Sequence, residues 1–136
     1  VYPSDPNVPP GRLGFAHAVN NASAVAARHG VPLFVTEYNA GLDGSTRTVP
    51  ILDTSYAAAF VVAQLAHVDA ANVAGMSYWT LSDVFEEQGQ QAAEFANAFG
   101  MQTYGGVAKP VLRAFELLAR FVDDARAIYP ATAVRA

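Results

Sequence analysis

Two apolar runs that stop at polar side chains limit what this chain of 136 residues can fold into. Residues 31–37 end at Glu37, and residues 73–80 end beside Trp79, the only tryptophan of the chain. Both runs are continuous rather than alternating, which is typical of strands covered on both faces in a parallel sheet. We therefore expect two buried strands, each ending in groups suited to binding or chemistry.

Three helices are expected around these strands. Apolar residues at helical spacing predict the first over residues 14–28, and Gly30 follows where a left-handed C-cap belongs. A capping side chain among residues 53–55 begins the second, which runs to about residue 69 and is apolar on nearly every side. Lys109 and Pro110 open the third, because proline suits the first helical position. The residues that carry the apolar spacing are Phe15, Ala18, Val19, Ala22, Val25 and Ala26 in the first helix and Val111, Leu112, Phe115, Leu118 and Val122 in the third.

The expected order is helix, strand, helix, strand, helix, which is typical of βα units around a parallel sheet in an α/β protein. Residues 1–13 are a proline-rich loop that leads in, and residues 123–136 form a tail without a clear pattern. Residues 81–106 are a long irregular connection of the kind that usually serves a site. In such folds, functional groups gather at the carboxyl ends of the strands.

Composition excludes several functions. The net charge of −4, with eight Lys and Arg and no basic run, argues against a nucleic-acid partner. The longest apolar stretch, residues 57–66, is about half of what a bilayer requires. No phosphate-binding glycine loop and no serine-hydrolase elbow occurs. The absence of cysteine removes thiol chemistry but fits either redox compartment, so localisation stays open.

Glu37 is the sharpest candidate for chemistry, because no Lys or Arg lies near it in sequence. A carboxylate there suits a nucleophile, a base or a metal ligand, and the plainer alternative is a loop carboxylate that hydrates the strand end. Since alternate residues of a strand share a face, Leu33 and Val35 should lie on the side of Glu37. By the same rule Gly75 and Ser77, with Val73, should lie on the side of Trp79, while Ala74, Met76 and Tyr78 face helices.

Trp79 stands close to three carboxylates, Asp83, Glu86 and Glu87. An aromatic face packs on the C–H face of a sugar ring while carboxylates accept hydrogen bonds from its hydroxyls. The plainer alternatives are a core aromatic and a solvated acidic loop. The three histidines, His17, His29 and His67, lie on expected helices without metal-ligand spacing, so we interpret them as structural and expect no metal.

At these residues the chain resembles glycoside hydrolase family 39, the family of β-xylosidases and α-L-iduronidases. The likeness extends over about residues 31–120. It lies in residues 34–39 (FVTEYN), residues 77–87 (SYWTLSDVFEE), Phe95 with residues 99–101 (FGM), and Lys109–Pro110 before an apolar helix.

The resemblance implies a retaining glycosidase on a (β/α)8 TIM barrel, with residues 73–80 as the eighth strand. Glu37 would be the nucleophile at the end of the seventh strand, and Trp79, Glu86 and Glu87 would bind the substrate sugar. The implied mechanism is double displacement, with a carbohydrate such as a β-xyloside as substrate and no metal or organic cofactor.

Two departures from the family pattern qualify this expectation. The family carries its acid/base in an Asn-Glu motif after the fourth strand, and no Asn-Glu pair occurs in this chain. A barrel takes about 200 residues or more. Residues 1–136 are therefore expected to be a carboxy-terminal part, the last two βα units, inactive alone and dependent on the missing N-terminal strands. Residues 95–99 also lack the His and Gly that are usual in the family, which leaves the sugar preference open.

Two alternatives stay open. The first is a carbohydrate-binding or interaction module that kept the sugar platform and lost catalysis. The second is another retaining hydrolase with a similar barrel and different substrates.

Overall fold

The computed structural model describes residues 13–41, 51–68, 72–84 and 93–124. Their order of helix, strand, helix, strand, helix confirms the predicted alternation. Among these residues no helix is both long and apolar enough to cross a membrane. The elements are α1 (Gly14–Arg28), β1 (Leu33–Tyr38), the 3-10 turn η3 (Ile51–Asp53), α2 (Ser55–His67), β2 (Val73–Tyr78) and α3 (Pro110–Asp124).

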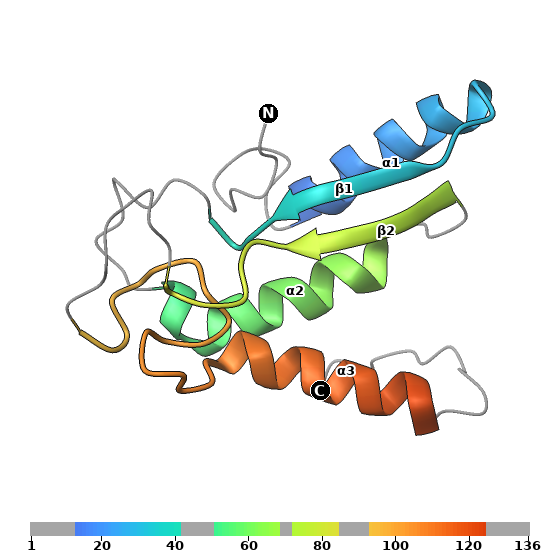
Figure 1. Ribbon diagram of the computed structural model, residues 1–136. Coiled ribbons are helices and arrows are strands. Elements are labelled where there is room, and N and C mark those ends of the chain that lie inside the picture. Colours follow the sequence, from blue (N-terminus) through green and yellow to red (C-terminus); the bar gives the residue numbers. More distant parts are fainter. Residues whose placement is uncertain (1–12, 42–50, 69–71, 85–92, 125–136) are drawn as a thin grey trace, which may run out of the picture.

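The two strands lie side by side and run in the same direction, which confirms the predicted parallel pairing (Figure 1). Their register pairs Leu33 with Val73 at one end and Tyr38 with Tyr78 at the other. Helix α2 contacts both α1 and α3, and the helices pack on one face of the sheet. The strand tips, the connection before α3 and the beginnings of α2 and α3 gather at one end of the molecule (Figure 1).

The alternation of faces along β1 is interrupted before its last residue, because its register is irregular between Val35 and Tyr38. Val35 and Tyr38 both contact the helical core, although they are an odd number of residues apart. One extra residue in a strand shifts the residues after it to the other face. Up to Glu37 the exposure alternates as expected, with Leu33, Val35 and Glu37 half-buried and Phe34 and Thr36 exposed. That Glu37 shares a face with Leu33 and Val35 stays a prediction.

Strand β2 has a matching irregularity near its start, between its pairs with Leu33 and Phe34. Val73 packs against the core, whereas Ala74 and Ser77 are exposed. Val73 and Ser77 therefore do not share a face, and Ala74 does not face a helix. The expectation that Met76 and Tyr78 face the helices is confirmed.

The sheet has one face without a cover among the described residues, and we call it the open face. It carries Phe34, Thr36, Ala74 and Ser77, all of them exposed. Phe34 is 62% exposed, although it lies in the middle of an apolar run. A Cβ atom on its register partner Gly75 would already contact the Phe34 ring at 3.4 Å. Both strands were expected to be covered on both faces, and the described residues cover only one.

Helix boundaries follow from local hydrogen bonds. Gly30 adopts a φ of 65°, and the amides of Gly30 and Val31 donate to the carbonyls of Ala27 and Ala26, which ends α1 in a Schellman motif. Thr54 is the cap of α2, since its hydroxyl oxygen accepts from the Tyr56 amide at 3.3 Å.

The buried faces of the helices differ in part from the expected ones. Helix α1 buries Phe15 and Val19 as expected, but Val25 is exposed. Helix α2 leaves Val62 exposed, so it is not packed on every side by the described residues. Helix α3 buries Val111, while Val122 near its end is 74% exposed. Hydrophobic spacing predicted the helices correctly, but it did not predict which of their apolar residues are buried by the described part of the chain.

A row of aromatic rings joins α1, both strands and α3. Phe15 stacks on Tyr38 with a centroid distance of 5.0 Å, and Tyr38 meets Tyr78 edge-on at 5.5 Å. Tyr78 then meets Phe115 edge-on at 5.7 Å. Burial raises the pKa of both tyrosines far above the usual value, so the two phenols stay neutral. Since Tyr38 and Tyr78 are the last residues of their strands, this row aligns the two strand ends.

We predict that the 136-residue chain alone self-associates through the open face, and that Phe34→Lys reduces this association. The unpaired strand edges and the exposed Phe34 ring favour contacts between copies, and a charge on that face opposes them. Sedimentation velocity over a range of concentrations measures the effect. Val25→Lys, on an exposed position of α1, is the control. A chain that is monomeric without any substitution, or an equal effect of both substitutions, would contradict the prediction.

Candidate active site

The ends of β1 and β2 bring the two main candidate residues to neighbouring positions. The Trp79 amide donates to the Tyr38 carbonyl at 2.9 Å, which extends the parallel ladder by one step beyond β2. Glu37 precedes Tyr38, so the carboxylate and the indole belong to adjacent strand ends. Glu86 and Glu87 lie outside the described residues. That the Glu37 and Trp79 side chains face one cavity stays a prediction, while the pairing and direction of their strands are confirmed.

Glu37 is half-buried, and its carboxylate has no hydrogen-bond or ion-pair partner among the described residues. Within the same residues no group of three or more His, Asp or Glu side chains could hold a metal ion. His17 and His67 are exposed on their helices, and the His67 ring nitrogen Nδ1 lies 2.8 Å from the Ala63 carbonyl oxygen. The described surroundings therefore offer Glu37 neither a cation nor fellow metal ligands.

Asn39 connects the two strand ends and was not singled out from the sequence. It is fully buried, and its amide nitrogen donates to the carbonyls of Trp79 and Phe99, the latter at 3.2 Å. Its Oδ1 atom accepts from the Gly41 amide at 3.3 Å. One polar side chain just after β1 thus contacts the residue just after β2. An asparagine directly behind a buried strand was the available sequence clue.

The connection from β2 to α3 folds back against the strand end. The Thr80 amide donates to the Phe99 carbonyl at 3.1 Å, and the Met101 amide donates to the Thr80 carbonyl at 2.8 Å. The Asp83 amide then donates to the Gln102 carbonyl at 3.0 Å. These bonds place residues 99–102 beside residues 80–83. The part of the predicted irregular connection that the structure describes is therefore held by backbone pairing.

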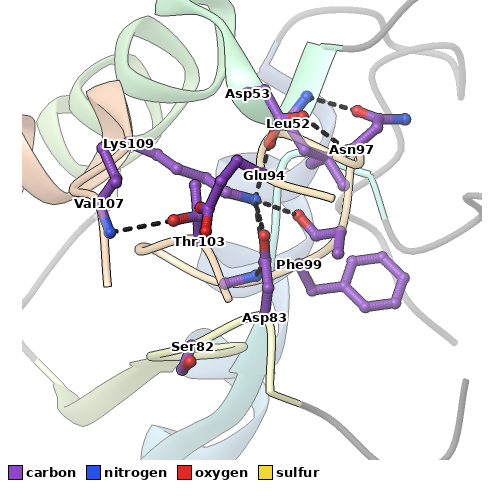
Figure 2. A network of polar contacts seen from close by, with 12 residues as sticks. Leu52, Asp53, Ser82, Asp83, Glu94, Asn97, Phe99, Thr103, Val107 and Lys109 are labelled. Carbon is purple, nitrogen blue, oxygen red and sulfur yellow. Dashed lines mark hydrogen bonds and ion pairs between the residues drawn. The ribbon is translucent and has the colours of Figure 1, made fainter. Parts of the chain in front are cut away.

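A buried ion network lies beneath this connection (Figure 2). The Lys109 side chain is fully buried, and its ammonium lies 2.7 Å from Asp53 Oδ1 and 2.7 Å from Asp83 Oδ2. It also donates to the Ala98 carbonyl at 3.0 Å. The ammonium thus donates hydrogen bonds to Asp83 and Ala98 and forms an ion pair with Asp53. Lys109, the only lysine of the chain, is thereby unavailable to Glu37.

Backbone amides complete the network around both carboxylates. Asp83 Oδ1 accepts from the Gly100 amide at 2.7 Å, and Asp53 Oδ2 accepts from the Asn97 amide at 2.6 Å. A Cβ atom at Gly100 would overlap the backbone at Asp83, so the close approach requires glycine. Asp83 was a candidate for sugar binding or a solvated loop, and the structure contradicts both interpretations because Asp83 is buried and paired. Asp53 was a possible helix cap, and Thr54 takes that place.

The comparison with known proteins decides the family. The family described as "Glycosyl hydrolases family 39" matches residues 15–131. The chain belongs to this family. It is 34% identical over 95 residues to a beta-xylosidase of Caldicellulosiruptor saccharolyticus, covering 70% of this chain and 19% of the relative. It is also 34% identical over 94 residues to a beta-xylosidase of Geobacillus stearothermophilus, covering 69% of this chain and 18% of the relative.

Solved structures agree with this family 39 assignment. The chain resembles the crystal structure of a monomeric beta-xylosidase from Caulobacter crescentus CB15 with a TM-score of 0.70 and 31% identity. The alignment covers 81% of this chain and 22% of that structure. The chain thus spans about a fifth of the length of the relatives that it matches.

The segment that departs from the family 39 pattern, residues 95–99, supports the buried network. Asn97 adopts a φ of 55°, and asparagine tolerates this left-handed region better than most residues. Its side-chain oxygen accepts from the Leu52 amide at 3.0 Å while its own amide donates to Asp53. Asn97 therefore binds the segment before α3 to the beginning of α2.

We predict that Lys109→Met lowers the free energy of unfolding by about 3 to 5 kcal/mol, because it leaves two buried carboxylates without a counter-charge. Urea denaturation of the enzyme that carries these residues measures the change. Arg113→Met is the matched control, since Arg113 forms an exposed ion pair with Glu116 at 2.7 Å. Its expected cost is about 0 to 1 kcal/mol. Equal costs for the two substitutions would contradict the assignment of Lys109 as the buried counter-charge of Asp53 and Asp83.

Proposed function

We propose that residues 1–136 form the last two βα units of a (β/α)8 barrel, in a retaining β-xylosidase. In this proposal β1 is the seventh strand and β2 the eighth. Glu37 is the nucleophile, and Trp79, with Glu86 and Glu87, binds the xylosyl ring. Family membership and the names of the relatives support a glycoside as substrate.

The observation that carries the proposal is the pairing of the strand ends. Tyr38 and Tyr78 are register partners in a parallel pair, and the Trp79 amide donates to the Tyr38 carbonyl. Glu37 lies one residue before Tyr38, and Trp79 lies one residue after Tyr78. Both therefore belong to the carboxyl end of the sheet. Parallel α/β folds bind their substrates at this rim.

The surroundings of Glu37 suit a nucleophile. In a retaining glycosidase one carboxylate attacks the anomeric carbon while the other protonates the leaving oxygen and later activates water. The attacking group reacts as the anion, and its negative charge is more reactive when no cation is bound to it. Among the described residues the Glu37 carboxylate has no such partner, and the Lys109 ammonium is held by Asp53 and Asp83.

Trp79 suits the sugar. Its backbone is held by two hydrogen bonds: the Trp79 amide donates to the Tyr38 carbonyl, and the Asn39 side chain donates to the Trp79 carbonyl. The backbone that carries the indole is therefore held in place. A flat aromatic surface covers the apolar face of a pyranose ring and leaves the hydroxyls to polar groups. The half-buried state of Trp79 fits a ring that contacts the core on one side.

The general acid/base belongs to the remainder of the enzyme. No Asn-Glu pair occurs in this chain, so the second carboxylate of the mechanism has to come from an earlier strand. The required separation is about 5 to 5.5 Å between the two carboxyl groups. Residues 1–136 alone are therefore expected to be without hydrolytic activity.

We predict that a 2-fluoro xyloside labels Glu37 covalently in the full-length enzyme. The fluorine slows breakdown of the glycosyl-enzyme, so the ester on the nucleophile accumulates and peptide mass spectrometry locates it. Glu37→Gly should abolish hydrolysis of aryl β-xylosides, and azide should restore turnover because a small anion fits where the carboxylate was.

The matched control is Glu116→Gln, which alters an exposed carboxylate on α3 and should leave turnover unchanged. A label on any residue other than Glu37 would refute the nucleophile assignment. An enzyme that binds xylo-oligosaccharides but neither turns over nor becomes labelled would favour the non-catalytic binding module.

A further inference from the structure

We propose that Asn39 is a positioning residue that sets the distance between the nucleophile and the sugar platform, an inference that rests on the roles proposed for Glu37 and Trp79. Asn39 itself is fully buried and has no exposed atom to offer a substrate. It acts through the backbone of the residues that it binds.

The hydrogen bonds of Asn39 define this role. Both protons of its side-chain nitrogen have an acceptor, the carbonyl of Trp79 and the carbonyl of Phe99. The first acceptor is the residue that carries the indole. The second belongs to the segment that pairs with Thr80, the next residue along. One rigid amide, two residues after Glu37, therefore holds the peptide between Trp79 and Thr80, directly at the Trp79 carbonyl and through the Phe99 carbonyl at the Thr80 amide.

The chemistry of the side chain is specific for this task. Two backbone carbonyls that converge on one atom require a group with two N–H donors, and an amide supplies them without a charge. The Oδ1 atom accepts from the Gly41 amide at 3.3 Å, which orients the amide plane. An aspartate of the same shape would bring a third oxygen against two carbonyl oxygens. Buried acceptors left unpaired are costly, so the Trp79 backbone would move away from Asn39.

The chain contains a natural control at the opposite end of the same strands. Asn72, directly before β2, donates from its side-chain nitrogen to the carbonyls of Val31 at 3.0 Å and Ser23 at 3.4 Å. It thus connects the beginning of β2 to α1 and to the turn before β1, at the amino ends of the two strands. A general contribution to strand pairing is common to Asn39 and Asn72, whereas a contribution to site geometry belongs to Asn39 alone.

The test compares Asn39→Asp, Asn39→Ser and Asn72→Asp in the full-length enzyme. Exhaustive labelling with the 2-fluoro xyloside, followed by intact mass measurement, counts the competent active sites of each preparation. The kcat and KM for an aryl β-xyloside are then expressed per competent site, which removes any loss of folded protein. Thermal denaturation of each variant records the structural effect separately.

We expect kcat per site to fall about 10- to 100-fold in both Asn39 variants with a smaller change in KM, because a small misplacement of reacting groups has effects of this size. Asn72→Asp should keep the kcat per site of the unsubstituted enzyme even where its melting temperature falls by a similar amount.

Unchanged kcat per site in the Asn39 variants would overturn the inference while leaving Glu37 and Trp79 in their roles. Failure of both Asn39 variants to give folded enzyme would also overturn it, since Asn39 would then be a folding residue. An unsubstituted enzyme that is labelled elsewhere than Glu37, or not at all, would remove the proposed function and this inference together.

Discussion

One buried ammonium holds the end of the molecule at which the strands terminate. Lys109, at the start of α3, contacts Asp53 just before α2 and Asp83 shortly after β2. Removing three charged groups from water is costly, and the amides of Asn97 and Gly100 offset part of this by binding the carboxylates. Apolar residues of the same volume often stabilise a protein equally well. The feature that sets this network apart is that its ion pairs and hydrogen bonds join specific atoms. The network joins the beginnings of α2 and α3 and the chain after β2 at one ammonium.

The same end of the sheet is held at two levels. The aromatic row from Phe15 to Phe115 aligns the strands from the helix side through apolar contact. The polar contacts of Asn39 and the backbone pairs of residues 80–83 then fix the chain that leaves β2. Apolar packing tolerates small shifts, whereas hydrogen bonds between buried groups do not. The second level therefore defines positions at the rim more closely than the first.

The sequence was sufficient for the elements and for the strand ends, because both depend on local patterns. An apolar run marked each strand, Gly30 marked the end of α1, and residues 53–55 marked the beginning of α2. Glu37 and Trp79 followed from the ends of the runs. Faces were predictable only in part: Met76 and Tyr78 face the helices as expected, but the irregularities that affect Tyr38 and Val73 arise only when the two strands pair. The ion network was not predictable either. Asp53 and Lys109 are far apart in sequence, and each had a plausible local role in starting a helix.

Exposure of Phe34 and Val122 has a related cause. Periodicity reports that a residue needs an apolar partner, but not whether the partner lies in the same stretch of chain. Phe34 belongs to a run with the composition of a strand covered on both faces, and the described residues cover one. The chain spans about a fifth of the length of its relatives, so its apolar surface and its length point to the same explanation. In the proposed barrel, further strands would pair with the edges of this sheet, and the open face would become the inner face of the barrel.

The distribution of charge around the rim completes this explanation. A carboxylate close to a free lysine forms an ion pair, and an ion-paired carboxylate is a weaker nucleophile. In this chain the one lysine is fully buried between two aspartates and a carbonyl oxygen. The network that fixes the connection before α3 thus also keeps a positive charge away from Glu37. Asp53 and Asp83 thus have a structural role at Lys109, separate from the role proposed for Glu37.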